Sequence, residues 1–455
     1  GAAEPRGAAM VRWIQAALGC LALVMVFLLA RSRGGDLAGA IAFLALAMYA
    51  PATFHETKLL DTVLSLFLTL LACVALDPLL RGGKGRGAAL GAGLLVGVAA
   101  LCRSANLLLA VLAAAVLLGR RRWARAATLL LGAAVPVLPV ALWNASASGD
   151  FIPVNYSEGH TFLVGNNPNC RGIYNLPEGY PDGVLGERQV EFERARRELG
   201  REPSPGEQRD HSYAEGFQFL REHPRAVPEL LLNKLRFALS SYSVNDNYSL
   251  VRERERYGML TWFRLPFSLL VLLGLGSFWL RPWSAWGAVG LPVAVTFLLL
   301  LAFYVTERYR LPMVPFLAVA AGVGLADLLR RERRRGVSRA AWLRAAVTCA
   351  CCGGFLLAVP LPVPARDLAH SERLFDLTLD VHAARRLQEL GEFDRAAAIL
   401  AVAVRDHPEA PGLENEFLAL VDGKTRQELA RIAKAARAAA PGAPRVEALL
   451  RLAGG

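Results

Sequence analysis

The sequence lacks any cysteine pattern that would indicate disulfide bonds or a metal centre. Six of its seven cysteines fall in apolar segments and Cys170 stands alone in a polar one, so neither a disulfide framework nor a zinc-ligand spacing emerges. Cys349, Cys351 and Cys352 form a cluster, but no histidine accompanies them. We interpret these three as small, polarizable packing residues of an apolar helix.

Acidic residues are few relative to basic ones. The chain has 39 Asp and Glu against 51 Lys and Arg, which gives a formal net charge of +12. A nucleic-acid-binding protein would concentrate this excess on a soluble face. Here many of the basic residues lie in short loops between hydrophobic runs, which membrane topology explains better. We therefore expect no nucleic-acid partner.

Long hydrophobic runs dominate the chain. Hydrophobic residues make up 54% of its 455 residues, and the mean hydropathy of +0.34 is typical of a polytopic membrane protein. A spanning helix needs about 20 apolar residues. The run 88–118 is too long for one span, so we divide it into two short helices that meet at Arg103. The other predicted spans are residues 10–30, 37–54, 59–80, 126–144, 261–280, 283–305, 311–329 and 340–360.

A polar insert separates the spans into two blocks. We predict an all-α polytopic membrane protein with about ten transmembrane helices and four regions. Residues 10–144 form a block of six spans, 145–260 a large extracytoplasmic insert, 261–360 a block of four spans, and 366–455 a C-terminal helical-repeat domain. A soluble module between two apolar blocks suggests a lid over a membrane-embedded cavity.

The orientation follows from the uneven distribution of basic residues over the short connections. Sixteen lie on one side and four on the other, and the richer side is cytoplasmic by the positive-inside rule. The insert, the tail and the N-terminus then lie outside. The four outer basic residues are Lys58, Arg103, Arg308 and Arg310.

An N-terminus on the outside needs an explanation. Residues 1–9 do not form a signal peptide, so we expect that the chain is incomplete and lacks at least one earlier span with its outer loop.

The insert and the tail both have helical patterns. In the insert, residues 228–239 are amphipathic, and such a helix either lies flat on the membrane surface or packs on the insert's own core. In the tail, residues 383–408 resemble the latter part of a tetratricopeptide repeat, with Gly391 at the turn between helices. Phe393, Ala396, Leu400, Ala403 and Pro408 match its aromatic, small and proline positions.

Ionisable residues at the outer ends of the spans are candidates for function. The first group, residues 54–61, contains His55, Glu56, Lys58 and Asp61, and the alternative is an interfacial charge cluster. The second is Arg103 with Asn106, at a break between short helices, where the alternative is an arginine that reaches the interface. The third is residues 306–312, with Arg308, Tyr309 and Arg310. Two guanidinium groups beside a tyrosine would bind a phosphate, although ordinary interfacial anchoring is the alternative.

The insert offers one further candidate. Asn166 and Asn167 lie in a Gly-Asn-Asn-Pro stretch, which either presents amides to a sugar or forms a structural turn. His160 and His211 have no evident partners in the sequence, and we assign neither to catalysis.

The order of these motifs resembles the GT-C type glycosyltransferases, in the bacterial family related to protein O-mannosyltransferases and lipid A aminoarabinose transferases. The resemblance covers roughly residues 11–329, and similar family members carry tetratricopeptide tails. This chain departs at Arg103–Ser104, where the family usually has Arg-Pro. The family's first outer loop, with its acidic motif, would precede Gly1. The matching stretches are residues 55–61, 97–106, 148–153, 162–168, 243–248 and 307–315.

This resemblance implies transfer of a sugar from a polyprenyl-phosphate donor to a glycan, lipid or protein acceptor outside the bacterial cytoplasmic membrane. Arg308 and Arg310, with Arg103, would hold the donor phosphate. Asp61 or Glu56 would act as base or as ligand of an optional divalent metal ion. His55, Lys58, Asn106, Tyr309, Asn166 and Asn167 complete the predicted binding set.

Two other classes of protein compete with this interpretation. A transporter would carry repeats between its halves, and the sequence has none that we detect. A non-catalytic membrane scaffold would use the helical tail to bind a protein partner. An acidic outer loop encoded upstream would favour the enzyme, and its absence would favour the scaffold.

Overall fold

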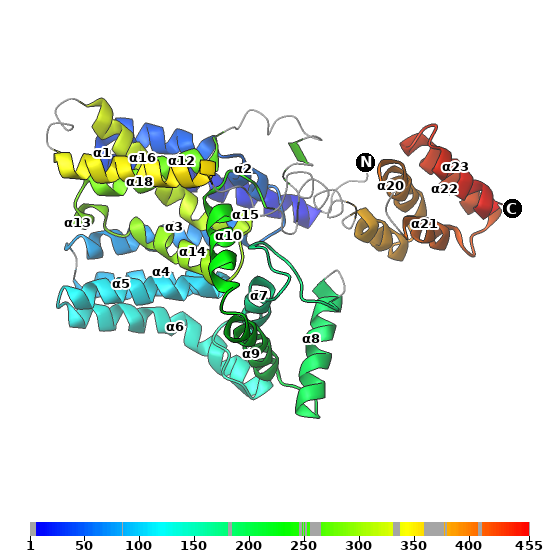
Figure 1. The fold of residues 1–455 in the computed structure, drawn as a ribbon, viewed down its shortest axis with the longest axis horizontal. Coiled ribbons are helices and arrows are strands. Elements are labelled where there is room, and N and C mark those ends of the chain that lie inside the picture. The colour runs from blue at the N-terminus through cyan, green and yellow to red at the C-terminus, as the bar shows by residue number, and fades with distance from the viewer. Residues whose placement is uncertain are drawn as a thin grey trace. The chain divides into compact units, whose positions relative to one another are not determined.

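The computed structural model describes residues 6–83, 85–180, 184–244, 248, 250, 253–254, 265–330, 337–358, 377, 380–407 and 412–454. It is 79% helical, and the described residues contain no β-strand. The chain divides into two compact units (Figure 1). The first comprises residues 1–246 and 253–362, and the second comprises 247–252 and 363–455. The predicted all-α class is therefore confirmed.

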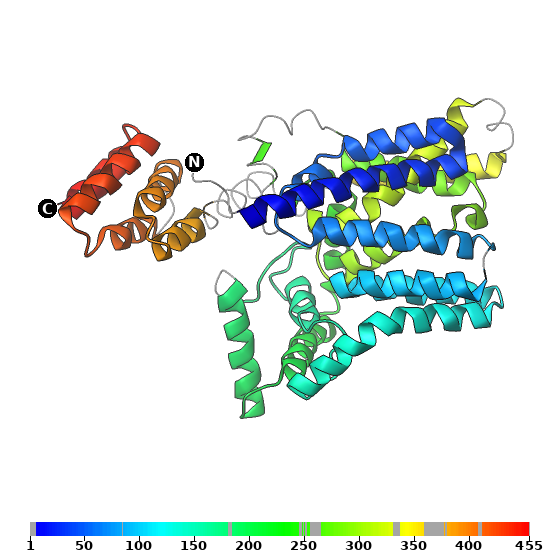
Figure 2. The same ribbon diagram turned by 180° about the vertical axis from the view of Figure 1, so that it is seen from behind.

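The first helix, α1 (Arg6–Ala47), contains the predicted span 10–30 and the first part of the predicted span 37–54. It reverses direction at Gly35, whose φ of +75° lies in the left-handed region that glycine adopts without strain. A Cβ atom on Gly39 would lie 2.8 Å from the ring of Phe27, so the two halves of α1 lie side by side. Figure 2 shows this hairpin in dark and lighter blue. The short helix α2 (Ala50–Glu56) follows, with Pro51 in its first turn.

The remaining helices of the first apolar block pack through small residues. They are α3 (Thr62–Leu80), α4 (Arg86–Cys102), η1 (Ser104–Asn106), α5 (Leu107–Gly119) and α6 (Trp123–Ser148). A Cβ on Gly93 of α4 would lie 2.9 Å from the Cα of Gly132 in α6. Glycines at this crossing bring the two backbones into close contact, as in many membrane helix pairs.

The second apolar block surrounds a buried helix, α16 (Val314–Leu329). Thirteen of its residues are buried, and it packs on α1 and on α12 (Phe267–Ser277). The other elements of this block are η3 (Phe278–Leu280), α13 (Trp283–Trp286), α14 (Gly290–Ala302), α15 (Glu307–Arg310), η4 (Leu311–Met313) and α18 (Arg339–Ala358). A Cβ atom on Gly322 would lie 2.6 Å from the Ala38 carbonyl oxygen, so small residues let α16 pack closely on α1.

Five of the described helices are long and apolar enough to cross a membrane, which indicates a membrane protein. Four further apolar helices have 10–17 residues. The predicted number of about ten spans therefore stays a prediction. The five long helices are residues 7–47, 62–80, 123–148, 307–329 and 339–358.

The insert folds as four described helices: α7 (Glu158–Gly165), α8 (Val184–Leu199), α9 (Pro205–Glu222) and α10 (Val227–Leu239). Ser204 and Glu207 form a capping box at the start of α9. Helix α10 packs on helices of the second apolar block and also contacts the insert, where Lys234 donates a hydrogen bond of 2.9 Å to Asn166. A position of residues 228–239 on the membrane surface stays a prediction. Arg236 donates a hydrogen bond of 2.8 Å to the Leu356 carbonyl, and Lys234 donates one of 3.1 Å to the Leu301 carbonyl.

The second unit contains α20 (Phe393–Asp406), α21 (Leu413–Val421), α22 (Arg426–Ala439) and α23 (Pro444–Gly454). Residues 380–389 are also helical, and Gly391, with a φ of +75°, lies at the turn before α20. Ala396, Leu400 and Ala403 are buried in the core of this unit. The predicted helix pair is present, whereas Pro408 lies outside the described residues. Membership of the tetratricopeptide class stays a prediction.

Candidate active site

A cavity of about 610 Å³ lies where the insert meets the two apolar blocks. It is bounded by the turn before α3, the break between α4 and α5, α7, α14 and α15. The structure thus brings together residues from all three groups at the outer span ends. The predicted site residues that line it are Asp61, Arg103, Asn106, Arg308 and Tyr309.

The break between α4 and α5 positions Arg103. Helix α4 ends at Cys102, and Arg103 adopts an extended conformation with φ −145° and ψ 113°. Its Nε atom lies 3.3 Å from Oδ2 of Asp61, the residue that precedes α3. The Asp61 side chain is 42% exposed, so this ion pair contributes only about 0–1 kcal/mol to stability. The ion pair instead orients the two side chains, so that a cation and a carboxylate lie next to each other at the cavity wall.

Tyr309 lies between two arginines. The guanidinium carbon of Arg103 is 5.6 Å from the centre of its ring, and that of Arg308 is 5.3 Å away. Thr306 caps α15 by accepting a hydrogen bond from the Tyr309 amide, which fixes the turn that carries these side chains. The ring accommodates both cations through cation–π contacts. An anionic ligand in the cavity would find two guanidinium groups next to one tyrosine ring.

Asn106 lines the cavity but is engaged with protein groups. Its Oδ1 atom accepts a hydrogen bond of 3.0 Å from Thr69, and its Nδ2 atom donates one of 3.0 Å to the Ala99 carbonyl. These bonds brace the end of α4 against α3. We therefore interpret Asn106 as a residue that positions Arg103 and not as a direct substrate ligand.

Arg310 does not belong to this site, and its predicted phosphate contact is wrong. The side chain is fully buried, and its two Nη atoms donate to the carbonyls of Phe237, Ser240 and Tyr242. It also pairs with Glu307, which accepts a hydrogen bond from Tyr49. Arg310 therefore joins the end of α10 to α15.

This role of Arg310 predicts a stability effect. Arg310→Ala is expected to leave Glu307 and several carbonyls buried without their partner, at a cost of about 3–5 kcal/mol. The expected result is a melting temperature lowered by several degrees in detergent, measured by differential scanning fluorimetry. Arg171→Ala, at an exposed position of the insert, is the control. A variant at position 310 with unchanged melting temperature would contradict this assignment.

Glu56 and His55 lie outside the Asp61 cavity. Glu56 lines a separate hollow of about 180 Å³ with Gly19, Cys20 and Leu23. Burial in this apolar setting raises the pKa of Glu56 to about 7. The structure therefore does not place Glu56 where a catalytic base of the Asp61 cavity would act.

His55 is buried, and neither of its ring nitrogens has a hydrogen-bond partner among the described residues. Burial, with Arg308, Arg103 and Lys58 nearby, lowers its pKa to about 4, although Glu307 opposes this shift. The imidazole of His55 is therefore neutral at pH 7, next to Arg103 and Arg308. Lys58 is also occupied, because its Nζ atom lies 2.7 Å from Glu253 and 4.8 Å from the centre of the Phe54 ring. Neither residue lines the cavity that contains Asp61.

Asn166 and Asn167 form the structural turn, which was the alternative to sugar binding. Asn166 donates hydrogen bonds to the carbonyls of Phe162 and Ala302 and accepts one of 2.9 Å from Lys234. Asn167 donates to the carbonyls of Leu163, Val164 and Asn175. Both side chains are buried. They hold the end of α7 in place and do not face the cavity.

The sequence reasoning missed Glu158, a second carboxylate that lines the cavity. It lies in the first turn of α7, three residues before Thr161, which lines the same cavity. This spacing places both on one helix face, so recognising residues 158–165 as a helix would have revealed them. The other polar lining residues that were missed are Ser65, Thr69, Ser104, Asn155, Ser157, Tyr213 and Thr296.

His160, two residues after Glu158 in α7, fixes the position of this helix and therefore of Glu158. His160 lies 2.7 Å from Glu191 and 3.3 Å from Glu187, so α7 is attached to α8. Burial alone would lower the pKa of His160, but its hydrogen bonds with the two glutamates outweigh burial and raise it to about 9. The expectation that His160 lacks partners is therefore wrong.

Asp61 and Glu56, the alternative candidates for a ligand of an optional divalent metal ion, face different cavities. Over the part of the chain that the structure describes, no group of three or more His, Cys, Asp or Glu side chains is arranged to hold a metal ion. Only one acidic partner, Glu158, accompanies Asp61 among the lining residues.

Comparisons with known protein families, with curated proteins and with solved structures found no match. The resemblance to GT-C type glycosyltransferases therefore rests on the sequence motifs, and the functional argument rests on the cavity.

Proposed function

We propose that this protein is a membrane glycosyltransferase that moves a sugar from a polyprenyl-phosphate donor to an acceptor. The observation that carries the proposal is the convergence of Asp61, Arg103 and Arg308 on one cavity. Its volume of about 610 Å³ is in the range of small-molecule binding sites. A lipid-linked sugar phosphate needs cations for its phosphate, polar groups for its sugar and an apolar wall for its chain.

The lining residues supply these three surfaces. Arg103 and Arg308 offer forked, charge-assisted hydrogen bonds to phosphate oxygens. Polar groups of the insert, including Asn155, Ser157 and Glu158, face the same space. The apolar wall consists of Leu107, Leu108, Leu109, Val295, Leu299 and Phe303. An isoprenoid chain would extend along this wall.

In the proposed reaction, the bond between the anomeric carbon and the phosphate oxygen breaks. A new bond forms between that carbon and the acceptor hydroxyl, whose proton passes to a carboxylate. The two arginines stabilise the charge that develops on the departing polyprenyl phosphate. We assign Asp61 as the base. Its carboxylate is paired with Arg103, but a donor phosphate would bind Arg103 in its place and leave the Asp61 carboxylate able to accept a proton. Glu158, from the insert, would bind hydroxyl groups of the sugar or acceptor.

The membrane setting that we propose is the outer face of a bacterial cytoplasmic membrane. About ten spans, with the insert and the tail outside, place Asp61, Arg103 and Arg308 at the outer ends of their helices. The tail would bind a protein partner.

Binding of the lipid carrier distinguishes this enzyme from a non-catalytic scaffold. Purified protein in detergent is expected to bind radiolabelled polyprenyl phosphate saturably, at about one molecule per chain. Unlabelled polyprenyl phosphate should compete, whereas the corresponding polyprenol, which lacks the phosphate, should compete at least tenfold less well, because charge-assisted hydrogen bonds contribute about 1.5–3 kcal/mol. Equal competition by the polyprenol, or no saturable binding, would favour the scaffold.

A further inference from the structure

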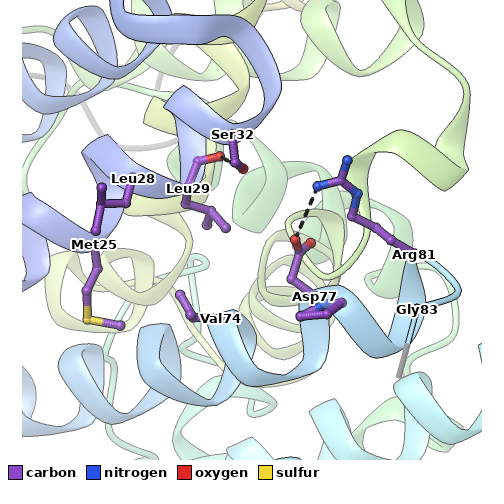
Figure 3. A pocket seen from close by; sticks show the side chains of 9 residues that line it. Met25, Leu28, Leu29, Ser32, Val74, Asp77, Arg81 and Gly83 are labelled. Carbon is purple, nitrogen blue, oxygen red and sulfur yellow. Dashed lines mark hydrogen bonds and ion pairs between the residues drawn. The ribbon is translucent and has the colours of Figure 1, made fainter. Parts of the chain in front are cut away.

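A second hollow, of about 570 Å³, lies at the opposite end of α3 from Asp61. Helix α3 has 19 residues and is therefore roughly 28 Å long, at 1.5 Å per residue; the hollow lies along its last turns. Figure 3 shows this hollow between the first half of α1 and the last turns of α3. Its lining residues are Met25, Leu28, Leu29, Ser32, Val74, Asp77, Pro78, Arg81 and Gly83.

One wall of the hollow is apolar and reaches the outer surface of the helices. Leu28 is 51% exposed and Val74 is 36% exposed, and both line the hollow together with Met25. In a membrane-spanning arrangement of α1 and α3, this surface faces the hydrocarbon of the bilayer. An acyl chain fits such a wall, whereas a small hydrophilic ligand does not use it.

The other end of the hollow carries a surplus of positive charge. Asp77 pairs with the buried Arg33 and also accepts a hydrogen bond of 3.1 Å from the Ala288 amide. Arg81 lies farther away, with its Nη1 atom 3.7 Å from Asp77 Oδ2, and its side chain is 40% exposed. One carboxylate thus faces two guanidinium groups. Because Arg33 and Arg81 share this single carboxylate, a net positive charge remains beside the hollow.

A third arginine adjoins the same turn. A Cβ atom on Gly82 would lie 3.3 Å from Nη2 of Arg122, so the Arg122 guanidinium packs against the turn between Arg81 and Gly83. Its buried Nη1 atom has no hydrogen-bond partner among the described residues. A buried donor without an acceptor is unfavourable. The Arg122 guanidinium therefore adds positive charge at the turn that borders the hollow.

We propose that this hollow binds an anionic phospholipid. Arg81 contacts the phosphate, Arg122 adds positive charge at the adjoining turn, and one acyl chain follows Met25, Leu28 and Val74. By the predicted topology, this end of α3 faces the cytoplasmic leaflet, whose surface potential is negative and attracts basic residues at span ends. The inference depends on the membrane setting and not on the proposed glycosyl transfer. The bound lipid would connect α1 to α3 beside the buried Arg33–Asp77 pair.

The test is the melting temperature of the full chain in neutral detergent with added lipid. Phosphatidylglycerol at saturation is expected to raise it by about 3 °C, because a ligand that binds only the folded state stabilises it. Phosphatidylcholine, which has no net charge, should raise it by less than about 1 °C. Equal effects of the two lipids would overturn the proposal, because the arginines would then have no role. An equal rise with inorganic phosphate alone would also overturn it, by indicating a site for free anions.

Matched variants locate the effect. The double variant Arg81→Ala, Arg122→Ala is expected to weaken phosphatidylglycerol binding at least tenfold, measured by native mass spectrometry. Arg339→Ala, at an exposed position in the first turn of α18, removes one basic residue elsewhere and should bind as the unaltered chain does. Full binding by the double variant would overturn the proposal.

A second variant keeps the proposal testable if the double variant fails to fold. Val74→Trp fills the apolar wall at a partly exposed position and leaves both arginines in place. It is expected to fold and to lose the response to phosphatidylglycerol. A full lipid response in this variant would mean that the acyl chain does not occupy the hollow.

Discussion

Replacing Arg308 by alanine is expected to lower sugar transfer from a radiolabelled polyprenyl-phosphate donor by about 100-fold. Arg308 lines the cavity and packs against Tyr309, so we assign it the largest share of phosphate binding. Hydrogen bonds to charged groups contribute about 1.5–3 kcal/mol, and each 1.4 kcal/mol is a factor of ten in affinity. Transfer in membranes that contain the full chain, followed by scintillation counting, measures the effect.

Two variants control this result. Arg308→Lys keeps the charge but loses the forked geometry, so we expect it to recover only part of the activity. Arg171→Ala removes an exposed arginine of the insert that does not line the cavity, and its activity should stay within about twofold of the unaltered chain. Unchanged transfer by Arg308→Ala, with normal expression, would remove Arg308 from the phosphate site.

Replacing Asp61 by asparagine is expected to lower the maximal rate of transfer at least about 100-fold. The change preserves size but removes the group that would accept the acceptor's proton, and general-base catalysis contributes about 10²–10⁴ in rate. The matched control is Glu56→Gln, because Glu56 precedes the same helix but faces a different cavity. Its rate should be retained within about twofold.

Comparing the two variants tests the choice of base. The sequence left Asp61 and Glu56 as alternatives, whereas the structure favours Asp61. If Glu56→Gln abolished transfer and Asp61→Asn did not, the assignment of the base would be wrong. The rate at saturating donor and the donor concentration at half-maximal rate should be measured for both variants, because a binding residue changes mainly the latter. We expect Asp61→Asn to change mainly the maximal rate.

The position of charges at the ends of apolar runs predicted much of the site. Asp61, Arg103 and Arg308 are far apart in the sequence, yet each lies at a span end assigned to the same side. Charged groups at such ends meet when the helices pack side by side, so this part of the site could be predicted. The break at Arg103 was also evident from the polar residues within a long apolar run.

Arg310 could not be separated from Arg308 without knowing that residues 307–310 are helical. Two residues along an α-helix correspond to a rotation of about 200° around its axis, so their side chains point to nearly opposite sides. Arg308 therefore faces the cavity while Arg310 enters the interior, where it bonds to three carbonyls. The sequence alone presents both as outward-facing basic residues beside Tyr309.

The prediction that Glu56 lies at the same site as Asp61 failed for a different reason. Glu56 ends α2, and its direction depends on how this short helix packs on α1, where Gly19 leaves room for the carboxylate. Such a contact joins residues that are distant in the sequence. No local periodicity indicates it, because α2 has only seven residues.

The most direct measurement of the central claim is photo-crosslinking with a polyprenyl phosphate that carries a photoreactive group near its phosphate. After irradiation of the full chain in detergent and proteolysis, mass spectrometry should find the label on peptides that contain Arg103, Tyr309 or residues 153–161, all next to the cavity. An excess of unmodified polyprenyl phosphate should prevent labelling. Label confined to the far end of α3, near Arg81, or spread over the exposed apolar helices without competition, would contradict a carrier-binding cavity between the insert and the apolar blocks.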